Sequence, residues 1–139
     1  MRDIKFRGKH KNPYGDKWVH GYYAMKDGKH VIIMPHAEDY IKSLNEPKPI
    51  SQISVEHTID VNTLGQYTGL RDKNGVEIYE GDIVKICSHG RYVIGKIIYE
   101  HCGFTADVTH NKELPYGRSS IIQPFVEVIG NIYDNPELF

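Results

Sequence analysis

Residues 66–85 read QYTGLRDKNGVEIYEGDIVK, and this stretch decides the fold. Near its centre stand Asn74 and Gly75, the residue pair that most strongly favours a tight hairpin turn, because both tolerate positive φ angles. Strand-forming residues precede this turn at 64–69, and others follow it after residue 82. The stretch therefore predicts short strands connected by tight turns.

A second turn is expected where Glu80, Gly81 and Asp82 lead into an apolar strand. In such a turn the Asp side chain commonly accepts hydrogen bonds from nearby backbone N–H groups, which would make it a structural residue. The alternative is that Glu80 and Asp82 form a paired carboxylate site for acid–base chemistry or metal binding. The sequence leaves both interpretations open.

Short strands continue to the end of the chain at a spacing of about ten residues, which is typical of a small barrel or sandwich. Turn residues separate them at His89-Gly90 and at Cys102-Gly103, and a polar loop is expected at 111–120. The predicted strands are 82–87, 92–100, 104–109, 121–122 and 125–132.

The first sixty residues predict a β-hairpin region with one short helix. The hairpin spans 17–34 and turns at Asp27-Gly28. Apolar residues recur with helical spacing at 37–44, and the Pro-containing segment 45–49 is a candidate linker. Further strands are expected at 4–7 and 51–59.

The composition of the 139 residues excludes several classes of protein. The hydrophobic fraction is 40% and the charged fraction 25%, as in ordinary globular proteins. Two cysteines are too few for a disulfide framework, and the longest aliphatic run, 31–34, is far too short to cross a membrane. The charged N-terminus does not resemble a secretory signal. We therefore expect a cytoplasmic protein without membrane contact, with reduced thiols and no cofactor.

Three blocks of the sequence carry a family resemblance: residues 1–7, the central stretch 66–85 and residues 127–138. The hairpin residues Trp18, Gly21, Tyr22 and Tyr23 add to it. In these blocks the chain resembles the YopX family of small phage and prophage proteins. The resemblance implies a β-rich protein with an SH3-like barrel or roll at 61–139, after the hairpin region at 1–60. It implies no catalytic residue, because the family has no assigned biochemical role.

Residues that could take part in catalysis or metal binding are present, but no known motif connects them. Eight histidines occur without a zinc-protease pattern, and no phosphate-binding or nucleophile-elbow motif is found. The nearest approach to a metal-ligand cluster is Cys87 with His89, together with His101, Cys102 and His110, and the Glu80/Asp82 pair is an alternative. A metal-dependent hydrolase is therefore a third hypothesis, behind two binding functions.

The leading hypothesis is a non-catalytic module that binds a host or phage macromolecule, and a homo-oligomer is compatible with it. Tyr and Arg dominate binding hot spots, so contact residues are expected among Tyr22, Tyr23, Tyr67, Arg71, Lys73 and Tyr79.

The second hypothesis is a nucleic-acid-binding module. The net charge of the chain is −1, but residues 1–30 alone carry a balance of +5. Basic side chains neutralise phosphates and aromatic rings stack on bases, so a basic face that also carries an aromatic residue suits nucleic acid. The residues expected on this face are Arg2, Lys5, Arg7, Lys9 and Trp18. A basic edge that merely prevents strand-to-strand aggregation is the structural alternative.

Overall fold

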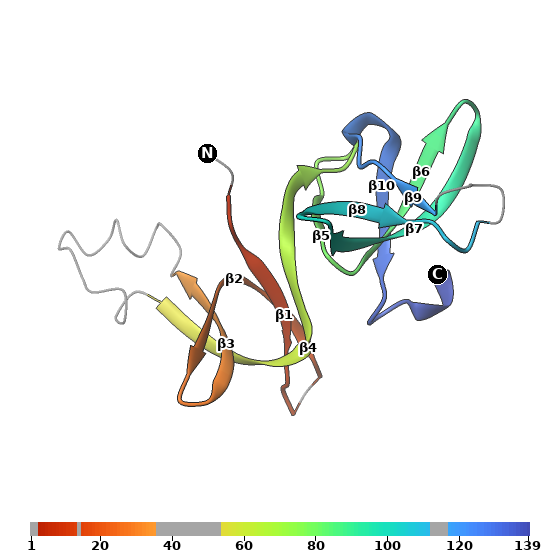
Figure 1. Cartoon of the computed structure of the whole chain (residues 1–139). Coiled ribbons are helices and arrows are strands. Elements are labelled where there is room, and N and C mark those ends of the chain that lie inside the picture. The colour runs from red at the N-terminus through yellow and green to blue at the C-terminus, as the bar shows by residue number, and fades with distance from the viewer. Residues whose placement is uncertain (1–2, 14, 36–53, 112–116) are drawn as a thin grey trace. The chain divides into compact units, whose positions relative to one another are not determined.

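The computed structural model describes residues 3–13, 15–35, 54–111 and 117–139, and strands dominate it (Figure 1). The strands are β1 (Phe6–His10), β2 (Lys17–Lys26), β3 (Lys29–Pro35), β4 (Ser54–Arg71), β5 (Glu77–Tyr79), β6 (Asp82–Ser88), β7 (Arg91–Glu100), β8 (Gly103–Asp107), β9 (Arg118–Ser119) and β10 (Val126–Asn131). Two short 3-10 helices, η1 (Gln123–Phe125) and η2 (Pro136–Leu138), follow β9 and β10. The predicted mainly β fold class is confirmed. The predicted helix at 37–44 lies outside the described residues.

The chain forms two compact units, residues 4–65 and residues 66–139. Sequence analysis placed the division after residue 60, whereas contacts in the structure divide the chain after Gly65, inside β4. Among the described residues, no helix is long and apolar enough to cross a membrane.

In the first unit the predicted hairpin is present as β2 and β3. Lys26 pairs with Lys29, and the two turn residues between them, Asp27 and Gly28, have φ angles of 50° and 73°. These positive angles are what a tight hairpin turn requires. β3 also pairs with β4, and β1 pairs with both β2 and β4, so the four strands close on one another.

The core of this unit follows from the alternation of side chains along the strands. Val19, Ile32 and Ile59 are buried on the inner face, with Phe6 and Tyr23 packed against them. The intervening residues of β1 and β2, such as Lys9 and Trp18, share the opposite face because side chains alternate along a strand.

The second unit contains a five-stranded antiparallel sheet in the order β10-β6-β7-β8-β9. The hairpin connections lie where turn residues predicted them, and His89, Gly90, His101 and Cys102 all have positive φ angles. The strand expected at 121–122 is absent, because Pro124 favours the start of η1 at this point instead.

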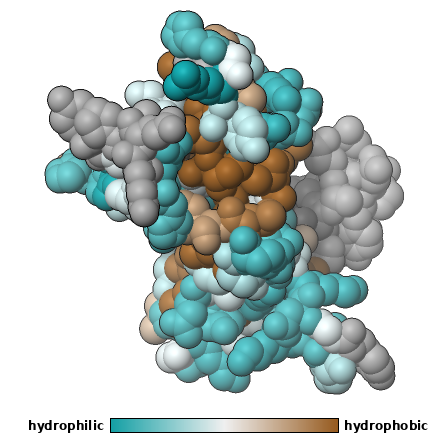
Figure 2. All heavy atoms as spheres, turned by 90° about the vertical axis from the view of Figure 1, so that its right-hand side faces the viewer, coloured by the Kyte–Doolittle hydropathy of each residue, from teal (hydrophilic) through white to brown (hydrophobic). Residues whose placement is uncertain are grey.

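A separate core fills the second unit. It contains Ile78, Val84, Ile86, Ile97, Ala106, Val108 and Val126, all buried. Other large apolar side chains stay exposed, and Figure 2 shows one face of the molecule on which hydrophobic side chains gather between hydrophilic ones. In the second unit the exposed ones include Leu70, Val76, Tyr92, Tyr99, Ile122 and Phe125.

Candidate functional site

The second unit has a half-open cavity of about 320 Å³ beside the β7–β8 turn. Alternate residues of β4 form one wall, and the ends of β7 and β8 form another, as expected where side chains of one strand face point the same way. The lining residues are Gln66, Thr68, Leu70, Tyr99, Cys102, Gly103, Phe104 and Ile121.

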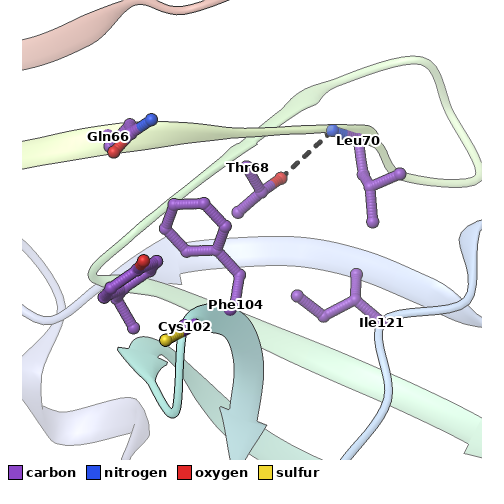
Figure 3. A pocket seen from close by; sticks show the side chains of 8 residues that line it. Gln66, Thr68, Leu70, Cys102, Phe104 and Ile121 are labelled. Atoms are coloured by element: carbon purple, nitrogen blue, oxygen red, sulfur yellow. Dashed lines mark hydrogen bonds between the residues drawn. The ribbon is translucent and has the colours of Figure 1, made fainter. Parts of the chain in front are cut away.

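The lining of this cavity is mixed, with the polar side chains of Gln66 and Thr68 beside apolar and aromatic ones. Thr68, Leu70, Phe104 and Ile121 point toward one another, and the Cys102 sulfur lies at the edge (Figure 3). The rings of Tyr99 and Phe104 meet edge to face, with centroids 5.1 Å apart and planes inclined by 66°. Tyr99 is 55% exposed. The cavity thus presents an accessible aromatic ledge beside a surface that carries both apolar and polar groups.

Thr68 holds the β4 wall in place. Its hydroxyl donates to the Ile78 carbonyl at 2.8 Å and accepts from the Leu70 N–H at 3.2 Å (Figure 3). Both bonds satisfy a side chain that is only 6% exposed. A hydroxyl that is hydrogen-bonded in this way holds the backbone around it in one conformation. The wall therefore has the same shape with or without a bound partner.

The loop that follows this wall is organised by Asp72. One carboxylate oxygen accepts from the N–H groups of Asn74 and Val76 at 2.8 and 2.9 Å, and the other accepts from Val128 of β10 at 2.9 Å. Burial raises the pKa of Asp72, but these three hydrogen bonds outweigh it, and the pKa lies below its ordinary value. Asp72 is therefore an ionised structural residue that ties the hairpin loop to β10.

The turn at Glu80–Asp82 also has a structural role. The Asp82 carboxylate is buried and accepts from the Tyr79 N–H at 2.7 Å, as the structural interpretation predicted. Gly81 has a φ of +87°, donates to the Ile97 carbonyl and accepts from the Ile132 N–H. The turn thereby connects β7 with the segment after β10.

The proposed metal ligands are not brought together. Cys87 pairs with Tyr92 at the start of β7, whereas Cys102 follows the far end of that strand, where Glu100 pairs with Gly103. Both thiols are exposed. Within the described ranges, no cluster of three His, Cys, Asp or Glu side chains could hold a metal ion.

Four of the six predicted contact residues lie in the second unit, and two of them are buried. Tyr67 and Tyr79 are 5% and 2% exposed, with ring centroids 5.4 Å apart, so their rings belong to the interior. Arg71 is exposed and binds the Gly75 carbonyl and Glu77. Lys73 is also exposed, and its hydrogen bond to Glu127 raises its pKa.

The other two predicted contact residues lie in the first unit, on opposite faces of β2. Tyr22 is 61% exposed, whereas Tyr23 packs on the core and its hydroxyl lies 2.6 Å from Nδ1 of His30. The six residues therefore do not form one surface within either unit.

The residues of the predicted basic face are close to one another in the first unit. Lys9 pairs with Trp18, and its ammonium lies 5.5 Å from the ring centroid. The Arg7 guanidinium lies 4.6 Å from the same ring and is 8% exposed. Lys5 precedes β1 and is half-buried, and Arg2 lies outside the described residues. Trp18 is thus already engaged by cations of its own chain.

Two histidines meet where β1 joins β4 in the first unit. The rings of His10 and His57 have centroids 4.8 Å apart, and His10 Nδ1 donates to the Thr58 carbonyl at 2.9 Å. Partial burial, and secondly the proximity of His10, lower the pKa of His57. The folded unit therefore disfavours protonation of His57.

We expect the stability of residues 4–65 to fall as the pH is lowered from 7.5 to 5.5. A histidine whose pKa is lower in the folded state stabilises the fold above its unfolded pKa of about 6.5, and this contribution is lost as the pH falls toward the folded pKa. Trp18 is the only tryptophan of the chain and lies in this unit, so its fluorescence reports urea unfolding there. His57→Gln should reduce the difference between the two pH values, while exposed His20→Gln should not.

The sequence analysis missed the cavity residues Leu70, Tyr99, Phe104 and Ile121. A signal for two of them was present, because a two-residue turn at His101-Cys102 makes Tyr99 and Phe104 direct cross-strand partners. The approach of β4 and of residue 121 to this pair is set by the tertiary fold, which local spacing does not reveal.

Comparison with known proteins places this arrangement in a family. The model of the YopX protein family matches residues 5–139. The chain is also similar to the crystal structure of protein EF1440 from Enterococcus faecalis, with 25% sequence identity, coverage of 99% of each chain and a TM-score of 0.50. No curated protein matches the chain. Since the family match covers nearly the whole chain, the protein belongs to the YopX family.

Proposed function

We propose that this protein is a non-catalytic phage or prophage accessory module that binds a macromolecule through residues 66–139. The observation that carries the proposal is the half-open cavity with its exposed aromatic rim. Concave apolar sites with a few polar groups are the usual places where proteins bind ligands, and SH3-like barrels commonly bind peptides or proteins.

The chemistry of the ionisable groups near the hairpin loop supports binding over catalysis. Asp72 and Asp82 each accept backbone hydrogen bonds, and Arg71 and Lys73 are paired with carboxylates. Such groups hold the fold together, whereas a catalytic acid or base must reach a substrate. These ionisable residues of the central stretch 66–85 thus stabilise the fold, and the cavity beside this stretch is the candidate contact region.

An affinity capture of the tagged chain from a bacterial host tests the proposal. A protein retained after nuclease treatment and at 0.5 M salt would support it. The same capture with Tyr99→Ala should recover less of that protein, because a Tyr that a partner buries at the centre of an interface can be a hot spot whose truncation costs about 2 kcal/mol or more. Recovery of the tagged chain alone, from hosts with and without an induced prophage, would contradict the proposal.

A second candidate function is nucleic-acid binding by the first unit, favoured by the positions of Arg7 and Lys9, whose cationic groups both lie near the ring of Trp18. Its distinguishing property is steep salt dependence, because bound phosphates release counterions. Binding of a fluorescent single-stranded oligonucleotide should then weaken at least about tenfold between 50 and 200 mM salt, and Lys9→Ala should weaken it further. Salt-independent binding, or none, would remove this candidate.

A further inference from the structure

We infer that the cavity beside the β7–β8 turn receives a single Tyr or Trp side chain from a protein partner. This inference rests on the proposed binding function and names its ligand chemistry. It is argued from the size, the polarity and the charge of the cavity.

The size of the cavity suits one aromatic side chain. Its volume of about 320 Å³ lies at the lower end of the range for ligand pockets. Such a space has room for a compact molecule or for one large side chain. The exposed ring of Tyr99 and the ring of Phe104 offer an incoming ring a surface for edge-to-face or offset contact.

The polarity of the lining favours a ring with a polar tip. Leu70, Phe104 and Ile121 are apolar, but Gln66 adds an amide that can donate and accept hydrogen bonds. A phenol O–H or an indole N–H that enters the cavity needs such a partner when it loses water. Tyr and Trp satisfy both conditions, and they dominate the anchor positions of protein interfaces.

The charge around the cavity argues against a phosphate-bearing partner. None of the eight lining residues is Asp, Glu, Lys, Arg or His. The basic residues that follow the β4 wall are already paired with carboxylates, Arg71 with Glu77 and Lys73 with Glu127. Nucleic acid would need cations to neutralise its backbone, whereas a neutral side chain of a protein does not.

The two exposed cysteines provide a direct test with small probes. Cys102 lines the cavity, and Cys87 lies at the other end of β7, so it is an internal reference. The probes are N-acetyl-tryptophanamide and N-acetyl-tyrosinamide, with N-acetyl-leucinamide as the aliphatic comparison. Iodoacetamide alkylation of each cysteine in the full chain is followed by mass spectrometry of its peptide.

We expect a Kd on the order of 1 mM for the aromatic probes, as is usual for ligands of this size. At about five times that concentration, alkylation of Cys102 should slow about sixfold while that of Cys87 stays unchanged. Equal protection by the leucine probe would overturn the aromatic assignment. Alkylation of Cys102 that no probe slows would also overturn the inference.

A matched pair of variants tests whether the probes bind at this cavity. Tyr99→Ala should raise the Kd of the tryptophan probe about five- to tenfold. Tyr92→Ala should not, although Tyr92 lies on the same strand and is similarly exposed, at 62% against 55%. Both changes leave the buried core intact, so each is expected to lower the thermal unfolding temperature only slightly, because Tyr99 loses its contact with Phe104 and Tyr92 its contact with Lys85.

The outcomes separate this inference from the proposed function. Probe binding without any partner in the affinity capture would support the cavity and overturn the proposed function. A captured partner that is insensitive to Tyr99→Ala, together with no probe binding, would overturn the inference and leave the proposed function standing.

Discussion

Replacing Asp72 by Ala is expected to lower the free energy of unfolding of residues 66–139 by about 3–4 kcal/mol. The carboxylate is 1% exposed and accepts three backbone N–H groups, from Asn74, Val76 and Val128. Its removal leaves these donors without acceptors in a place that water reaches poorly. Hydrogen bonds to a charged group are worth about 1.5–3 kcal/mol each, and partial relaxation of the loop offsets some of the loss.

Urea unfolding followed by circular dichroism measures this effect, and Trp18 fluorescence shows in the same samples whether the first unit is unaffected. Asp107→Ala is the control. Asp107 also accepts the N–H of the residue two positions on, Thr109, but its side chain is 16% exposed and lies beside Arg118, so water and Arg118 remain available to it and we expect a smaller loss, of about 1 kcal/mol. Equal losses for the two variants would show that Asp72 does not join the loop to β10.

The hairpins were predictable because their signals are local. Asp27-Gly28 and His89-Gly90 both adopt the positive φ angles that their residue types favour, and the flanking strands begin within a few residues of their expected positions. The tight turn predicted at Asn74-Gly75 is different: of the two residues only Gly75 has a positive φ, of 82°, and residues 72–76 all lie between β4 and β5, so the two-residue turn expected there was wrong. A strand pair that is joined by two residues has little freedom of register, so local sequence is enough to specify it.

The length of β4 was not predictable, because contacts from a distant part of the chain sustain it. Sequence analysis gave separate strands at 51–59 and 64–69, with polar residues between them. In the structure Asp60 accepts from the Asn62 N–H and from the Thr63 hydroxyl, and Thr63 in turn accepts from the Lys9 N–H of β1. Lys9 and Thr63 are 54 residues apart in the sequence, so their hydrogen bond forms only when β1 lies beside β4. The continuity of β4 therefore depends on the presence of β1.

The contact residues were predicted by residue type, and two of them, Tyr67 and Tyr79, lie in the interior because the property that makes Tyr useful at an interface also suits a core. A tyrosine suits a core as well as an interface, because its ring is apolar and its hydroxyl needs only one partner. The Tyr79 hydroxyl finds that partner in Glu77 at 2.8 Å, and the ring packs inside against Tyr67. Tyr99 has an equivalent sequence context in β7, but it lies near the end of that strand and its side chain stays exposed.

Replacing Gly81 by Ala is expected to destabilise residues 66–139 by about 2–3 kcal/mol. Two costs combine at this position. The φ of +87° is unfavourable for any residue with a Cβ, and an added Cβ would lie 3.0 Å from Cε2 of Tyr133. The backbone cannot easily rotate away, because Gly81 is held by hydrogen bonds to Ile97 and Ile132.

Gly75→Ala isolates the first cost from the second. Gly75 has nearly the same φ, +82°, but a Cβ there would meet nothing within 4 Å, so we expect a loss of about 1 kcal/mol. The difference between the two variants, measured by urea unfolding, is the energy of the contact with Tyr133. If Gly81→Ala and Gly75→Ala lose the same stability, Tyr133 moves freely and the turn is constrained by φ alone. If the difference persists, the turn before β6 and the segment after β10 are packed as one unit. A substitution in either of these two segments would then also affect the packing of the other.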